Sequence, residues 1–255
     1  MKHHPSPAAN RQATYPRFTK SMKTDYTILI PNMATLHFNI IKHVFTNHGY
    51  KAVLLETMGP HIVQEGQKYV HNDICYPAML VIGQMIDALK SGLYDVQKTA
   101  LVITQTGGGC RASNYLALLR KALVRAGMPQ IPVISLNLKG MEKNPGFKLS
   151  LPMLQQTFSG LVYGDLIMLL ANQVRPYEDH KGDTDALVAQ WTSRLGNLFK
   201  RNRGYFGWAM KRNFASIVTD FASIAVTRTK KPKVGIVGEI YMKFSPLGNN
   251  NLEQF

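Results

Sequence analysis

The chain has 255 residues, of which 45% are hydrophobic, so it is long enough for one large domain or two smaller ones with a proper core. Its 30 lysine and arginine residues outnumber its 15 aspartate and glutamate residues, and the net charge is +15 at pH 7. A charge of this size indicates a polyanion, an anionic cofactor or an acidic partner protein, without choosing among them.

Membrane insertion and export are not expected. The longest apolar stretch, residues 161–171, is too short to cross a bilayer and contains Asp165. The first twenty residues lack the apolar core of a secretory signal, so residues 1–22 are expected to be a flexible arm or linker. We therefore predict a cytoplasmic protein with no membrane partner.

The first elements predict a parallel sheet. Residues 26–31 (YTILIP) are typical of a strand, residues 34–49 have helical spacing and end at Gly49, and residues 51–56 form a second strand. Strand, helix and strand within about 30 residues make a βαβ unit, which places its two strands in parallel.

The alternation continues to residue 174. We predict a helix that has Pro77 in its first turn, and a later helix that Ser150 caps. Residues 23–174 are thus expected to form one α/β domain. In chain order the further elements are a helix at 76–92, a strand at 99–104, a helix at 112–127, a strand at 131–136 and a helix at 152–172.

After residue 174 the pattern changes. Strand signals disappear, and residues 175–230 are expected to be a helical connection with helices over about 183–202 and 207–226. Residues 231–240 (KPKVGIVGEI) then predict a new strand that runs into a loop. We interpret residues 231–255 as the start of a second, truncated α/β domain.

The glycine-rich stretch TQTGGGCRASNY, residues 104–115, allows several kinds of site. Gly107, Gly109 and Ala112 satisfy a dinucleotide fingerprint, but in a late turn and without the acidic residue that holds a ribose after the next strand. A phosphate loop is excluded because no Lys-Ser/Thr pair follows the glycines. A nucleophilic role for Cys110 would need a base, and no histidine of the sequence is tied to it.

A metal site gains support from the two cysteines of the chain. Cys75 and Cys110 each lie in a loop that leads into a helix, at the carboxyl ends of βα units where open α/β sheets place their ligands. Helix N-termini favour the thiolate, the form that binds metal. Composition alone favours packed free thiols, and two cysteines do not complete a cluster that usually takes four.

Longer stretches of the sequence resemble a known family. They include YVHNDICYPAMLVIGQMIDAL, TQTGGGCRASNYLALLRKAL and VGIVGEIYMKFSPLGNN, with IPVISLN, NPGF, YGDL and RPYE between the second and the third. Together they resemble the C-terminal region of the long CoA-substrate-specific enzyme activases, which is itself similar to subunits of 2-hydroxyacyl-CoA dehydratases. The resemblance covers about residues 18–255.

The resemblance implies flavodoxin-like or Rossmann-like α/β domains around a [4Fe-4S] cluster. Cys75 and Cys110 would be metal ligands, and a third ligand would lie beyond Phe255. An ATP-dependent activator domain or subunit would supply an electron to the cluster, and the substrate would be acyl-CoA-like. The chain could act in this way as part of a homodimer or a heterodimer. The chain lacks the activator's phosphate-binding motifs, so we expect part of a dehydratase-like lyase or reductase that is inactive as this isolated polypeptide. The expected cluster-loop or cofactor-binding residues are Gly107, Gly108, Gly109, Arg111 and Asn114.

Several other polar residues could face such a site. Asp73 is more simply expected to cap the helix that contains Pro77. The basic aromatic segment, residues 194–212, would suit a solvated helix face, nucleic acid or the phosphates of CoA, and nucleic acid is the weakest of these because no reader motif accompanies the charge. The alternative function is a cluster-free structural or anion-binding module. The candidate substrate-binding residues are Asn72, Asp73, Glu239, Lys243, Asn249 and Asn250.

Overall fold

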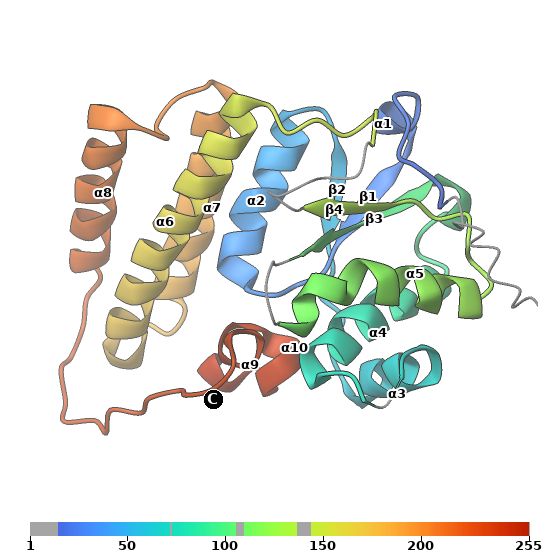
Figure 1. Ribbon diagram of the computed structural model, residues 1–255. Coiled ribbons are helices and arrows are strands. Elements are labelled where there is room, and N and C mark those ends of the chain that lie inside the picture. Colours follow the sequence, from blue (N-terminus) through green and yellow to red (C-terminus); the bar gives the residue numbers. More distant parts are fainter. Residues whose placement is uncertain (1–14, 72, 106–109, 137–143, 255) are drawn as a thin grey trace, which may run out of the picture.

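A four-stranded parallel sheet lies at the centre of the molecule (Figure 1). The computed structural model describes residues 15–71, 73–105, 110–136 and 144–254. The strand order is β2-β1-β3-β4, as in the first four strands of the flavodoxin-like arrangement, so the predicted α/β fold is confirmed. The strands are β1 (Thr27–Ile30), β2 (Lys51–Leu54), β3 (Thr99–Thr104) and β4 (Val133–Leu136).

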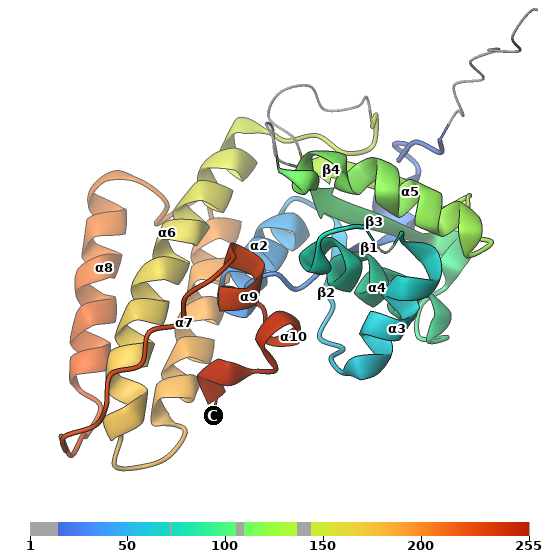
Figure 2. The ribbon, with the colours of Figure 1, turned by 60° about the horizontal axis from the view of Figure 1, so that its bottom comes forward.

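Helices cover both faces of the sheet, because successive side chains of each strand point to opposite sides. In β1, Leu29 packs into the core beneath α3, α4 and α5, whereas Ile28 and Ile30 pack into the core beneath α2 and α6. Figures 1 and 2 show these two helical layers on either side of the strands. Their bounds are α2 (Thr35–Asn47), α3 (Pro60–Tyr69), α4 (Tyr76–Lys90), α5 (Tyr115–Arg125) and α6 (Leu151–Val174).

The helix boundaries follow the expected local chemistry. Gly49, Gly92 and Gly127 have positive φ angles of 84°, 76° and 75° at or just after helix ends, as predicted from their places in the sequence. The Ser150 hydroxyl accepts a hydrogen bond from the Met153 N–H at 3.3 Å and caps α6, also as predicted. Short elements connect the main ones: α1 (Met22–Asp25), η1 (Val96–Lys98) and η2 (Arg111–Asn114).

The predicted helical connection is present and extends the layer of α2 and α6. It consists of η3 (Arg175–Tyr177), α7 (Asp183–Lys200) and α8 (Gly207–Ala222). Trp191, Phe199 and Phe221 are buried in the same core as α2 and α6. The Tyr163 hydroxyl of α6 accepts a hydrogen bond from Asn213 Nδ2 of α8 at 3.0 Å, which joins the two helices in the interior.

The strand predicted for residues 231–240 is wrong. A strand needs a hydrogen-bonding neighbour, and within the described chain nothing pairs with this segment. Val234 and Val237 are accordingly 83% and 94% exposed. Two short helices and a 3₁₀ turn follow in place of the predicted loop: α9 (Ile240–Phe244), α10 (Pro246–Asn249) and η4 (Leu252–Gln254).

The C-terminal segment, residues 239–254, returns to the sheet and packs beside α4 (Figure 2). Leu247 joins the core of α3, α4 and α5. The fully buried Ser245 hydroxyl donates a hydrogen bond to the Asn32 carbonyl oxygen at 3.0 Å, just after β1. The end of the described chain therefore lies against the carboxyl edge of the sheet. None of the described helices combines the length and apolarity that crossing a bilayer requires.

Candidate thiol site

Both cysteines lie at the start of a helical element at the carboxyl side of the sheet. Cys75 is the residue that precedes α4, and its thiol is half-buried. Cys110 precedes η2, which leads directly into α5, and its thiol is exposed. The Cys110 sulfur accepts a hydrogen bond from the Ala112 N–H at 3.4 Å. Each sulfur thus lies at a helix start, where free N–H groups stabilise negative charge.

Tyr115, the first residue of α5, lies beside Cys75. Its side chain is only 5% exposed, and its hydroxyl oxygen lies 3.6 Å from the Cys75 sulfur. Burial is the largest cause of a strongly raised pKa of Tyr115, and the contact with Cys75 adds to it. Because the phenol stays protonated, its O–H group is able to donate a hydrogen bond to the sulfur.

Cys110 and Glu239 lie close enough to Tyr115 that their charges raise its pKa further. Glu239 belongs to the C-terminal segment, where its Oε2 accepts a hydrogen bond from the Met242 N–H at 3.2 Å and caps α9. Burial, together with the charge of Glu239, also raises the pKa of Tyr241 to about 12. Three segments far apart in the sequence therefore meet around Tyr115.

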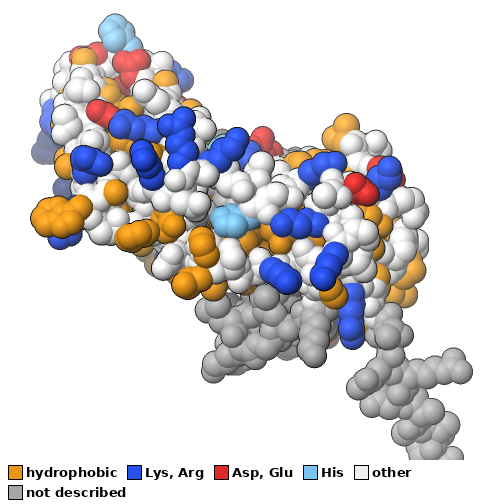
Figure 3. Space-filling model, turned by 90° about the horizontal axis from the view of Figure 1, so that it is seen from above, with side chains coloured by type: hydrophobic (Ala, Val, Ile, Leu, Met, Phe, Trp, Pro, Cys, Tyr) orange, Lys and Arg blue, Asp and Glu red, His pale blue; other side chains and the backbone are white. Residues whose placement is uncertain are grey.

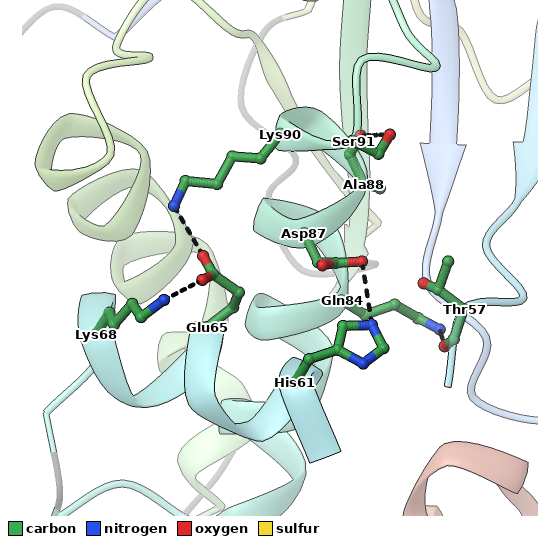
Figure 4. A network of polar contacts seen from close by, with 9 residues as sticks. All are labelled: Thr57, His61, Glu65, Lys68, Gln84, Asp87, Ala88, Lys90 and Ser91. Atoms are coloured by element: carbon green, nitrogen blue, oxygen red, sulfur yellow. Dashed lines mark hydrogen bonds and ion pairs between the residues drawn. The ribbon is translucent and has the colours of Figure 1, made fainter. Parts of the chain in front are cut away.

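The crossing of α3 and α4 sets the position of Cys75. Gly66 and Gly83 face the opposite helix so closely that a Cβ on Gly83 would lie 2.3 Å from the Ile62 carbonyl oxygen. On the surface, Glu65 of α3 bonds Lys68, and its Oε2 lies 2.8 Å from Lys90 Nζ of α4 (Figure 4). Such exposed ion pairs contribute little, so the close glycine packing determines how the helices cross.

Gln84 ties α4 to two strand ends and is almost completely buried. Its Oε1 accepts a hydrogen bond from the Asn32 N–H at 3.1 Å, just after β1. Its Nε2 donates to the Thr57 carbonyl oxygen at 2.9 Å, just after β2 (Figure 4). These bonds hold the middle of α4 against the carboxyl edge of the sheet, and the rigid helix carries Cys75 at its start.

The remaining predicted residues of the glycine loop are only partly described. Gly107, Gly108 and Gly109 lie outside the described residues, as does Asn72. Arg111 begins η2, and its side chain is likewise outside the description. Asn114, the last residue of η2, has an exposed side chain.

The prediction that Asp73 caps α4 is wrong. Cys75 occupies the capping position, and its side chain makes no capping hydrogen bond. Asp73 is exposed, and its Oδ2 lies 3.2 Å from His71 Nδ1. Asp73 lies two positions before the capping residue, and its carboxylate pairs with the nearby imidazole instead.

The predicted polar residues of the C-terminal segment mainly stabilise that segment. Asn249 Nδ2 donates to the Lys243 carbonyl oxygen at 3.2 Å, and Asn249 Oδ1 accepts from the Leu252 N–H at 3.1 Å. Asn250 ends α10 in the left-handed conformation, with φ 55°. The Lys243 ammonium lies 5.4 Å from the centre of the Phe244 ring.

A cleft of about 690 Å³ is separate from the cysteines. It lies between the start of α2, helix α7 and the C-terminal segment, and His37, Arg175 and Phe244 are among its lining residues. Neither cysteine is among the described residues that line it. The cleft and the thiol site are therefore lined by different described residues.

The basic aromatic segment, residues 194–212, lies where α7 ends and α8 begins, at the end of the helical layer away from α9 (Figure 1). Phe199 and Tyr205 are buried in the core, as expected for a solvated helix face. Phe206 and Trp208 are instead exposed, and Lys211 lies 5.0 Å from the Trp208 ring centre. Lysine and arginine side chains also extend across the face that Figure 3 shows.

Thiols are suitable ligands for a metal ion or an iron–sulfur cluster, but the described thiol site has too few of them. The Cys75 thiol contacts Tyr115, and the Cys110 thiol lies at the start of η2, but no group of three or more His, Cys, Asp or Glu in the described part of the chain is arranged to hold a metal ion. Comparison with protein-family models, curated proteins and solved structures gives no significant match. The family resemblance therefore depends on the sequence motifs alone.

Tyr115 and Tyr241 were not predicted from the sequence to belong to the site. Tyr115 lies within the stretch that the sequence singles out, but as an ordinary residue of an amphipathic helix. No spacing signal marks it, because its contact with Cys75 depends on how α4 and α5 pack. Tyr241 becomes a neighbour only because the C-terminal segment folds back to the sheet.

Proposed function

We propose that this chain is an iron–sulfur module related to 2-hydroxyacyl-CoA dehydratases, in which Cys75 and Cys110 are two thiolate ligands of a [4Fe-4S]-type cluster. The observation that carries this proposal is the position of both cysteines at helix starts on the carboxyl side of the sheet, with the Cys75 sulfur 3.6 Å from the Tyr115 hydroxyl oxygen. The remaining ligands would come from a partner chain or from sequence outside the described residues. The chemistry of such a bound group would be one-electron transfer, from an ATP-dependent activator to an acyl-CoA-like substrate.

The protein groups have separate roles in this proposal. The helix start at Cys75 and the Ala112 N–H at Cys110 stabilise thiolate charge. The protonated Tyr115 hydroxyl orients the Cys75 sulfur, and a hydrogen bond to a ligand sulfur tunes the reduction potential of an iron–sulfur site. Glu239 adds negative charge beside the site, which opposes further reduction.

Iron and sulfide content after anaerobic purification and reconstitution tests the proposal, together with visible absorption and EPR spectra. We expect a near-stoichiometric cluster in the wild type and its loss in Cys75→Ser and in Cys110→Ser. Ser113→Ala is the matched control, because Ser113 lies in the same turn but offers no thiol. A wild type that binds no iron with or without an added partner chain, or cysteine variants that keep it, would refute the proposal.

The alternative is a cluster-free anion-binding module, which the basic surface and the exposed Phe206 and Trp208 favour. This function predicts binding of single-stranded DNA or CoA that weakens steeply with salt and is unchanged in the cysteine variants. Substitution of Trp208 by Ala should weaken such binding, whereas it should leave the iron content of the first proposal unchanged.

A further inference from the structure

A second cavity, of about 280 Å³, lies between the sheet and the layer of α2 and α6. Ile30 of β1 and Val102 of β3 form its floor, and residues of both helices form its sides. Phe38 and Ile41 come from α2, and Leu154 and Leu161 from α6. Its volume is near the lower end of the roughly 300–1,000 Å³ that is typical of ligand pockets.

The described walls of this cavity offer no free hydrogen-bonding side chain. Only Thr104 and Thr157 among the described lining residues carry polar side-chain atoms. The Thr157 hydroxyl donates to the Met153 carbonyl oxygen at 2.8 Å, and the Thr104 hydroxyl contacts the Met33 sulfur at 3.6 Å. A water molecule needs two to four polar partners, so these walls favour an apolar occupant over water.

The position of the cavity also indicates a ligand site. It lies at the carboxyl ends of β1 and β3, where the chain changes direction across the sheet, from β2 on one side of β1 to β3 on the other. Open α/β sheets place their ligands at this switch point. Phe158 both lines the cavity and is 55% exposed, so the cavity reaches the surface beside α6.

We propose that this cavity binds the unbranched aliphatic chain of an amphipathic ligand, such as a fatty acid, whose polar head remains in solvent. A bound aliphatic chain would give the apolar side chains of the walls the van der Waals contacts that they lack when the cavity is empty. A head group outside the cavity needs no partner within it, which agrees with the absence of free polar side chains in the described walls. The proposal is independent of the thiol site, since neither cysteine lines the cavity.

A chain-length series tests the proposal. Hexanoate, octanoate, decanoate and dodecanoate are titrated into the full chain by calorimetry, below their micelle-forming concentrations. Each added methylene should strengthen binding roughly fourfold while it is being buried. The gain should cease near about ten carbons, if each one occupies a water-sized volume of about 30 Å³. Absence of saturable binding, or affinity that does not depend on chain length, would overturn the proposal.

Two neighbouring residues of α6 provide a matched pair of variants. Leu161 lines the cavity, whereas Val162 does not and is 47% exposed. Leu161→Trp should fill the cavity and reduce decanoate affinity at least tenfold, while Val162→Trp should leave it within twofold. Leu161→Ala should enlarge the cavity and move the optimum to a longer chain.

Circular dichroism and thermal unfolding show whether each variant is folded. If Leu161→Trp does not fold, Leu161→Ala still tests the proposal through its shift to a longer chain. Unchanged binding by a folded Leu161→Trp protein would place the fatty acid elsewhere. Iron content, measured in parallel, should be the same in all three variants, so a failure here is distinguishable from a failure of the cluster proposal.

Discussion

Substitution of Gly83 by Ala tests the inference that glycine packing sets the crossing of α3 and α4. Helix propensity alone would favour alanine by about 1 kcal/mol. The new Cβ, however, would lie 2.3 Å from the Ile62 carbonyl oxygen and 3.0 Å from the Gly66 nitrogen. Both obstacles are backbone atoms, so no side-chain rotation relieves the collision, and the two helices would have to separate by about 1 Å in a close-packed core.

The two effects have opposite signs, and the collision should prevail. Overpacking costs typically 1–3 kcal/mol, and a backbone obstacle corresponds to the upper part of that range. After subtraction of the propensity gain, we expect a loss of about 2 kcal/mol, which lowers the melting temperature by about 4–8 °C in a chain of this size.

Differential scanning calorimetry and urea unfolding measure this change. Gly235→Ala is the control, because a Cβ there meets nothing within 4 Å, and it should change stability by less than about 0.5 kcal/mol. A melting temperature of Gly83→Ala equal to or above that of the wild type would refute the reasoning. Because α4 carries Cys75, the variant should also bind iron less well after reconstitution.

Two further predictions concern a buried amide and a half-buried carboxylate. Gln84→Leu should cost about 2–4 kcal/mol by urea unfolding, because it leaves the Asn32 N–H and the Thr57 carbonyl oxygen without their partner; a cost below about 1 kcal/mol would show that water replaces both bonds. Burial by itself would raise the pKa of Glu178, but hydrogen bonds from Thr184 and Gly182 lower it below its usual value of about 4.3. The folded state therefore gains stability from this carboxylate above about pH 4.3 and loses it as the pH falls through the lowered pKa. Glu178→Gln should be less stable at pH 7 and lose less stability on acidification, and parallel pH profiles for the two proteins would contradict this assignment.

Local sequence signals were sufficient to predict the sheet and most of its helices. The β-branched runs at β1 and β3 are buried on both faces, so their identity as strands does not depend on distant residues. Each predicted helix boundary depends on a residue beside it: glycines end α2, α4 and α5, and Ser150 caps α6. Such features are predictable because the interaction that decides them lies within a few residues.

Features that depend on distant partners were not predictable. Residues 231–240 have the composition of a strand, but pairing needs a neighbour that the described chain does not place there. Helix α3 was missed because it is short and largely polar, with only Ile62 and Gly66 buried. At the site, the position of both cysteines at the same edge of the sheet was predictable, because the sheet is parallel. The contact of Tyr115 with Cys75 was not, because it depends on how α4 packs against α5.

The exposed stretch before α9 has a practical consequence for splitting the polypeptide. Lys230 and Lys233 lie there in solvent-accessible backbone outside the helices and strands, open to trypsin, whereas Lys231 is protected because Pro232 follows it. The peptide beyond the cut would still contact the body through Ser245 and Leu247. Cleavage should thus yield two polypeptides that migrate together until a denaturant separates them, and recombining them would allow Glu239 and Tyr241 to be labelled or exchanged separately from both cysteines.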